Sequence, residues 1–155
     1  MKPPFPPITD ILPHRGTMLF IDAVTDYSPT ATTCIYQPHA DAWYADGDSN
    51  MPAWLGIEIM AQTIAAHVGL NAIARGQAPK MGALLGSRNY HSQVATFVAY
   101  TPLTIYALLE FRDDSGLGAY ECRITADGRE IASATLKVFE PENFDQFIAT
   151  GTQAS

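Results

Sequence analysis

Glu58 is the residue of this sequence whose setting best suits acid–base chemistry. It lies in the apolar run WLGIEIMA at residues 54–61, and no other Asp or Glu occurs between Asp48 and Asp113. Burying an unpaired carboxylate is costly, so such a group finds a polar partner or stays protonated. Two interpretations follow. The carboxylate faces a solvent gap or pairs structurally with an arginine, or it is an acid in an apolar pocket, poised to give or take a proton.

Few other side chains are placed to act with this acid. Gln62 follows four residues later on the same helix face and can hydrogen-bond the carboxylate. His67, nine residues past Glu58, projects from roughly the opposite face, so a core or surface role is expected. Cys34 and Cys122 match no metal spacing and are interpreted as reduced thiols. The sequence contains no Ser-His-Asp order, phosphate loop or metal-ligand spacing.

Residues 51–74 form the long helix that the sequence predicts. Pro52 suits its first position, Asn50 or the serine before it is expected to cap that end, and Gly76 marks a stop. Apolar residues occur nearly all round this helix rather than on one stripe. A helix of that kind is expected to be buried.

Most of the remaining chain is predicted to form strands, with Asp127-Gly128 as a two-residue hairpin turn. A curved antiparallel sheet would cover the helix on most sides, which predicts an α+β fold. The expected domain covers residues 1–140 and begins with a Pro-rich arm, and residues 141–155 form a tail that packs through Phe144 and Phe147. Strands are expected at residues 18–24, 30–36, 81–93, 103–112, 120–125 and 130–139.

The composition narrows the class of partner. The chain is 47% hydrophobic and carries a net charge of −7, with 16 acidic and 9 basic residues. Nucleic acid and anionic membranes both require basic surfaces, so neither is expected as a partner. The first residues contain no apolar signal-peptide core, and no apolar run is long enough for a membrane span. A cytoplasmic protein is therefore predicted.

Two segments resemble the bacterial 3-hydroxyacyl-(acyl carrier protein) dehydratases of the FabA/FabZ family. Residues 51–62, MPAWLGIEIMAQ, resemble the start of that family's central helix, where an acidic residue follows six residues after a proline. Residues 12–22, LPHRGTMLFID, resemble its opening segment. The Pro-Ala-Trp form looks most like the ApeP-type dehydratase-like proteins of aryl polyene clusters. The resemblance implies a hotdog fold, in which a curved antiparallel β-sheet wraps around one long central α-helix.

The resemblance also implies roles for particular residues. Glu58 matches the family's acid, which protonates the departing 3-hydroxyl while a histidine takes the proton from C2. The position of that histidine, fourteen residues before the acid, is occupied by Tyr44, and a phenol is a poor base at neutral pH. His39, five residues further upstream, is the alternative if the loop is rearranged. Backbone N–H groups of Ala53 and Trp54 match the donors that polarise the thioester carbonyl.

Tyr44 and Gln62, together with Ala53 and Trp54, complete the expected substrate-binding set. His14 belongs to the opening segment and is interpreted, with Arg15, as a structural or entrance residue. The base therefore stays open among His39, Tyr44 and His14.

Three functions are compatible with these residues. The resemblance favours a 3-hydroxyacyl-[acyl carrier protein] dehydratase that eliminates water to give the 2-enoyl thioester. The alternatives are a non-catalytic acyl-thioester-binding subunit of a heteromeric dehydratase, prompted by Tyr44, and an acyl thioesterase.

The resemblance implies partners as well. The substrate is carried on the phosphopantetheine of an acyl carrier protein, whose acidic surface is expected to meet Arg15, Lys80 or Arg88. A homodimer, or a dimer with another hotdog chain, is expected because family sites lie between two subunits. No bound cofactor or metal is expected.

Overall fold

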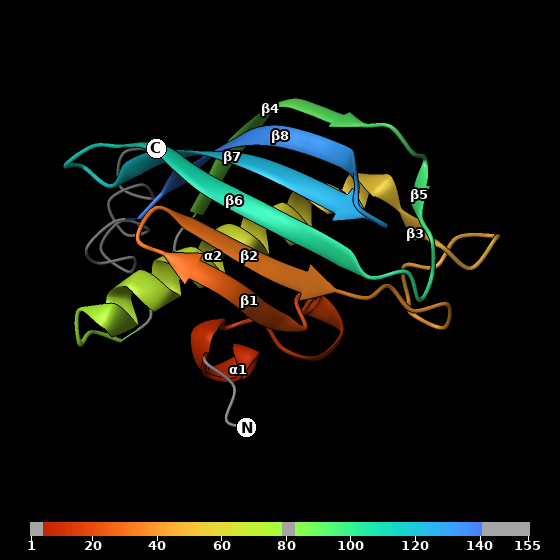
Figure 1. Cartoon of the computed structure of the whole chain (residues 1–155), viewed down its shortest axis with the longest axis horizontal. Coiled ribbons are helices and arrows are strands. Elements are labelled where there is room, and N and C mark those ends of the chain that lie inside the picture. Colours follow the sequence, from red (N-terminus) through yellow and green to blue (C-terminus); the bar gives the residue numbers. More distant parts are fainter. Residues whose placement is uncertain (1–4, 79–82, 141–155) are drawn as a thin grey trace, which may run out of the picture.

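The computed structural model describes residues 5–78 and 83–140 (Figure 1). The strands are β1 Ala23–Ser28, β2 Ala31–Tyr36, β3 Met51–Pro52, β4 Ala83–Ser92, β5 Thr96–Phe97, β6 Leu103–Arg112, β7 Leu117–Ala126 and β8 Arg129–Phe139. A six-stranded antiparallel sheet has the order β1-β2-β6-β7-β8-β4, and β3 pairs with β5 in a second, small sheet. The helices are α1 Ile8–Ile11 and α2 Gly56–Ala74, with 3-10 turns η1 at Gly16–Met18 and η2 at Ala53–Leu55.

Helix α2 lies in the concave side of the curved sheet, as Figure 1 shows. By length and composition, residues 53–74 would suffice to cross a membrane, but 61% of the most apolar stretch is buried inside the fold. The helix ends in a glycine-based Schellman motif. Gly76 has a φ of +72°, and the Gln77 N–H donates to the Ala72 carbonyl at 2.9 Å. The buried helix, its stop and the α+β class are confirmed.

The inner face of the sheet is the other half of the core. On β7, Tyr120, Cys122 and Ile124 are fully buried, and the residues between them point outward. The β7–β8 hairpin turns at Asp127-Gly128, where both residues have positive φ, as a type I′ turn requires. Cys34 and Cys122 are free and buried, and burial raises the pKa of both thiols above its ordinary value. These thiols stay protonated and belong to the core.

The strand expected at residues 18–24 is wrong. Gly16–Met18 forms the turn η1, and β1 begins only at Ala23. The reason is visible in the hydrogen bonds of this segment. The N–H of Phe20 donates to the Gln62 side chain at 2.8 Å instead of joining a strand ladder. The opening segment is thus tied to helix α2 before it enters the sheet.

The entry to helix α2 also differs from expectation. Met51 and Pro52 pair with β5, and the chain then passes through η2 before the α-helix begins. Asn50 does not cap the helix, because its side-chain oxygen accepts the Ala99 N–H at 3.0 Å. At the junction, a Cβ on Gly56 would collide with the Tyr90 hydroxyl, so a larger residue there would force the Tyr90 side chain to move.

Some predictions concern residues that the structure does not describe. Phe144, Phe147, the 141–155 tail and Lys80 lie outside the described residues. The 1–140 domain boundary stays a prediction.

Candidate active site

A cavity of about 200 Å³ runs along helix α2 beside the edge of the large sheet. Its helical lining extends from Glu58 to Val68, which corresponds to about 15 Å of helix. Leu84 on β4 and Val138 on β8 face the helix across it, and these two residues are register partners. The remaining lining residues are His14, Ala61, Gln62, Ile64, Ala65 and Glu140. The cavity is therefore an apolar slot with polar groups on its wall.

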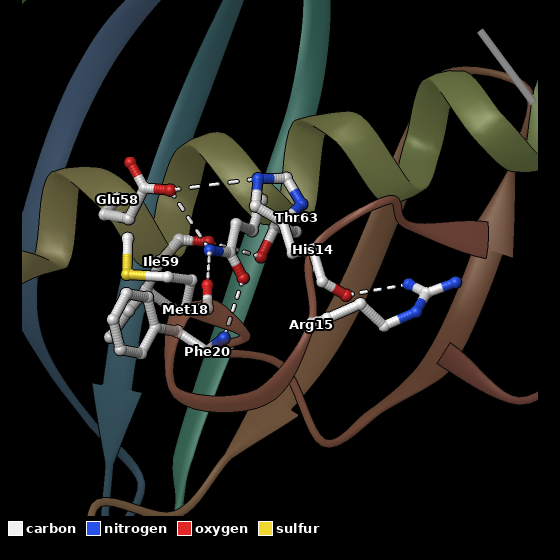
Figure 2. A network of polar contacts seen from close by, with 8 residues as sticks. His14, Arg15, Met18, Phe20, Glu58, Ile59 and Thr63 are labelled. Atoms are coloured by element: carbon white, nitrogen blue, oxygen red, sulfur yellow. Dashed lines mark hydrogen bonds and ion pairs between the residues drawn. The ribbon is translucent and has the colours of Figure 1, made fainter. Parts of the chain in front are cut away.

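Glu58 lies on the wall of this cavity, with 39% of its side chain exposed. The sequence left open a carboxylate at a solvent gap or an acid in an apolar pocket; the structure places Glu58 on the wall of a mostly apolar cavity and leaves its side chain accessible to solvent. Gln62 holds it: Nε2 donates to Glu58 Oε1 at 3.0 Å (Figure 2). The predicted hydrogen bond between these two side chains is confirmed.

Gln62 is 1% exposed, and its remaining contacts fix the orientation of its amide. Its Oε1 accepts the Phe20 N–H at 2.8 Å, and its Nε2 also donates to the Met18 carbonyl at 2.8 Å. Since a backbone N–H only donates and a carbonyl only accepts, the amide cannot be reversed. Gln62 therefore presents a donor, never an acceptor, to Glu58.

His14 is a basic side chain that lies beside Glu58 in the same cavity. Its Nε2 is 4.0 Å from Glu58 Oε1, and 29% of its side chain is exposed. The Arg15 guanidinium secures the turn that carries it, donating to the carbonyls of Thr9, Leu12 and His14 at 2.8, 2.6 and 2.8 Å. Figure 2 shows His14 beside Glu58 over the helix. Arg15 thus has a structural role, as the sequence indicated.

Tyr44, which the resemblance matches to the family histidine, is 6% exposed. Its hydroxyl lies 2.7 Å from the Tyr36 hydroxyl and accepts the His39 N–H at 3.0 Å. The phenol is therefore committed to core hydrogen bonds.

His39 is exposed, and its ring packs edge-on against Tyr36 and Tyr100. It lines a separate hollow of about 400 Å³ with Tyr44 and Trp43. Within one chain, the structure does not bring His39 or Tyr44 into the Glu58 cavity.

At the start of the helix, only one of the two backbone N–H groups expected to donate to a thioester carbonyl is available. The Ala53 N–H donates to the Ala95 carbonyl at 3.0 Å, and the Ala53 carbonyl accepts from the Tyr90 hydroxyl. Trp54 follows in the η2 turn, where the first N–H groups of a helix have no partner inside it. Its indole is 65% exposed and does not line the cavity.

His67 lies on the buried side of the same helix and is fully inaccessible. Its Nδ1 is 2.7 Å from the Thr32 hydroxyl and its Nε2 is 3.1 Å from Asn71 Nδ2. Burial lowers the pKa of His67 to about 4, so it is neutral at physiological pH. Of the two expected positions for His67, core or surface, the structure shows the core.

Sequence reasoning missed two features of the cavity. It interpreted His14 as a structural or entrance residue and kept it only as one of three candidate bases, without predicting that it lies beside Glu58. It also gave no role to Glu140, whose carboxylate pairs with Arg112 Nη2 at 2.8 Å and lines the cavity. Neither pairing had a signal in spacing, because each joins segments far apart in the chain. In the described residues no group of three or more His, Cys, Asp or Glu is arranged to hold a metal ion.

A curved antiparallel sheet wrapped around one long central helix defines the hotdog class of proteins. Within it, this chain belongs to the ApeP-like family: the family model described as ApeP dehydratase matches residues 6–149. The resemblance seen in the sequence is thereby confirmed, and the protein is a dehydratase-like hotdog protein.

Solved structures agree with this assignment. A chain of the dehydratase heterocomplex ApeI:P from Xenorhabdus doucetiae is 27% identical, with a TM-score of 0.86, and the match covers 94% of this chain and 97% of that one. A hypothetical thioesterase with coenzyme A from Streptococcus pneumoniae is 13% identical, covering 76% and 84% with a TM-score of 0.61. The PaaI protein of E. coli is 10% identical, covering 76% and 78% with a TM-score of 0.60. The last two share the fold alone. No curated protein matches the sequence.

Proposed function

We propose that this chain is a subunit of a dehydratase that removes water from a 3-hydroxyacyl thioester carried on an acyl carrier protein. The observation that carries the proposal is the position of Glu58. Its carboxylate lies on the wall of a mostly apolar cavity and is held by Gln62, and the resemblance matches Glu58 to the family's acid. An apolar slot suits an acyl chain, and a partly exposed acid can reach a substrate that enters from solvent.

The hydrogen bond from Gln62 specifies how Glu58 would act. Because Gln62 Nε2 is a donor, Glu58 Oε1 must accept, in the acid form as well as in the carboxylate. The acid proton then resides on Oε2. Glu58 would give that proton to the 3-hydroxyl as the C3–O bond breaks, so that the leaving group departs as water. The Trp54 N–H remains the candidate donor to the thioester carbonyl.

A second hotdog subunit is part of the proposal. The relative ApeI:P is a heterocomplex, and β4, beside the cavity, is an edge strand of the sheet. Leu84 and Leu85 of this strand are 43% and 53% exposed. Pairing β4 with another hotdog chain, identical or different, would cover this edge. His39 would reach Glu58 only from such a second subunit.

The carrier protein would approach the rim of the cavity. Arg88 is exposed on β4 and remains a docking residue in the proposal, while the Arg15 guanidinium is engaged with backbone carbonyls. The substrate's phosphopantetheine belongs to the carrier, and the elimination itself needs only proton transfers.

The test is dehydration of a 3-hydroxyacyl carrier thioester, followed by mass spectrometry, with the chain alone and mixed with a hotdog partner. We expect the 2-enoyl product in at least one arm and a loss of about 10²-fold or more in Glu58→Gln. Glu110→Gln, on an exposed part of β6, is the matched control. Absence of product in both arms, beside an active reference dehydratase, would falsify the proposal.

Thioester hydrolysis is the second candidate, and the exposure of Glu58 favours it. A carboxylate that is 39% exposed in its side chain can activate a water molecule as well as protonate a leaving hydroxyl. Release of free thiol from acyl thioesters that lack a 3-hydroxyl, lost in Glu58→Gln, would identify this activity.

A further inference from the structure

A histidine, His14, lies beside Glu58 in space, even though the position that the resemblance assigns to the family histidine is occupied by Tyr44. His14 and Glu58 line the same cavity, with Nε2 and Oε1 4.0 Å apart. Both side chains are partly exposed, so both are accessible to a ligand in the cavity. An elimination removes a proton from C2 and a hydroxyl from C3. These carbons are bonded to each other, so the acid and base that act on them must be neighbours.

The position of His14 is fixed by contacts that do not involve its ring. Three hydrogen bonds from Arg15 hold the turn through backbone carbonyls. Gln62 then anchors the following residues to helix α2 through Met18 and Phe20. The segment that carries His14 is therefore tied to the same side chain that holds Glu58. Such support keeps two reacting groups in a defined geometry.

The ring of His14 differs from that of a structural histidine. Its Nδ1 is buried and has no hydrogen-bond partner among the described residues, and its Nε2 faces Glu58 beyond hydrogen-bonding distance. A buried polar atom without a partner is unfavourable and is retained in native proteins where another requirement holds it. The ring is not placed to maximise its own hydrogen bonds. It is placed beside the acid.

We infer that His14 is the catalytic base of this chain; the inference rests on the proposed function. His14 Nε2 takes the proton from C2, and the C2–H electron pair forms the C2=C3 double bond. The C3–O bond breaks, and the proton of Glu58 goes to the departing hydroxyl to form water. His14 is left as imidazolium and Glu58 as carboxylate. Transfer of one proton from Nε2 to Glu58 Oε2 through an intervening water restores both groups.

The experiment separates the base from the acid. A butyryl-pantetheine thioester has C2 protons but no 3-hydroxyl, so in D2O it reports proton removal at C2 without elimination. We expect the wild type to exchange C2 protons for deuterium, measured by mass spectrometry, in the subunit arrangement that dehydrates. His14→Asn should lose this exchange and lower dehydration by about 10²-fold or more. Glu58→Gln should lose dehydration and keep exchange. Glu110→Gln, at an exposed position on β6 away from the β4 edge, is the control and should keep both exchange and dehydration.

Chemical rescue distinguishes a catalytic role from a structural one. His14→Ala leaves a space beside Glu58, and added imidazole should restore exchange and dehydration in a concentration-dependent way. The fold should survive both substitutions, because the ring of His14 makes no hydrogen bond that anchors the segment. Thermal unfolding checks this.

Two results would overturn the inference. In one, His14→Asn dehydrates at the wild-type rate. In the other, His39→Asn and not His14→Asn abolishes exchange, which would place the base on a second subunit. Either result leaves the proposed function intact if Glu58→Gln is inactive. Conversely, exchange that depends on His14 without any dehydration would reject the proposed function and keep His14 as a base.

Discussion

Helix α2 carries Glu58 toward the cavity and His67 toward the sheet, and the two side chains differ in burial and in hydrogen bonding. His67 is fully buried, with a hydrogen-bonding partner at each ring nitrogen. Glu58 is 39% exposed in its side chain and meets His14 at 4.0 Å, too far for a hydrogen bond. His67 thus has its polar contacts satisfied inside the core, whereas the exposed part of Glu58 remains available to a ligand in the cavity. Substitutions on the two sides should therefore separate stability from activity.

His67→Ala should have the largest effect on stability. It removes a fully buried ring and leaves Thr32 and Asn71 without their partner, which we expect to cost about 4 kcal/mol in the free energy of unfolding. Urea unfolding measures this, and turnover per folded molecule should be unchanged. Loss of turnover in molecules that remain folded would show that the buried side also takes part in catalysis.

The same residue predicts how stability depends on pH. Burial lowers the pKa of His67 from 6.5 to about 4, so between these values the unfolded chain binds a proton that the folded chain does not. Its contribution is complete above about pH 6.5 and is lost as the pH falls toward 4, by up to about 3 kcal/mol. Unfolding curves across this range, compared with His67→Gln, measure the effect. An equal pH dependence in the variant would contradict it.

Gln62→Ala should affect both sides of the comparison. It leaves the Phe20 N–H and the Met18 carbonyl without their side-chain partner and frees Glu58 from its donor. We expect a loss of about 2 kcal/mol in the free energy of unfolding, with a lower turnover number as well. Gln62→Glu is the informative companion, because it keeps the acceptor for Phe20 and removes the amide donor to both Glu58 and the Met18 carbonyl. If that variant retained full activity, the donor would be dispensable.

Tyr44→Phe should have the smallest effect. The hydroxyl lies within hydrogen-bonding distance of Tyr36 and accepts from the His39 N–H, so its removal should cost about 1 kcal/mol in stability. Turnover should fall by less than about threefold, since a hydroxyl committed to the core does not carry out the proton transfer. A hundredfold loss would restore Tyr44 as a site residue.

The features that the sequence predicted well are those that depend on local pattern. The apolar helix around Glu58, the alternation at Tyr120, Cys122 and Ile124, and the turn at Asp127-Gly128 all follow from side-chain periodicity or backbone preference. The fold class follows from these elements together, because a helix that is apolar all round needs a sheet that wraps it.

The features that the sequence did not predict depend on contacts between distant segments. The 18–24 strand failed because the backbone at Phe20 is bound by a helix side chain 42 residues later. The meeting of His14 with Glu58 likewise requires knowing that the opening segment crosses the helix. A sequence motif identifies candidate residues, but the three-dimensional structure is needed to show which of them line the same cavity.

The amide hydrogen of Phe20 offers a direct readout of whether the site is assembled. It is donated to Gln62, the side chain that also holds Glu58, so it exchanges with solvent only when the opening segment lifts from helix α2. The protection of that single proton therefore measures the fraction of molecules in which His14 stands beside the acid. Ligand that occupies the slot should slow its exchange, even when no product is formed.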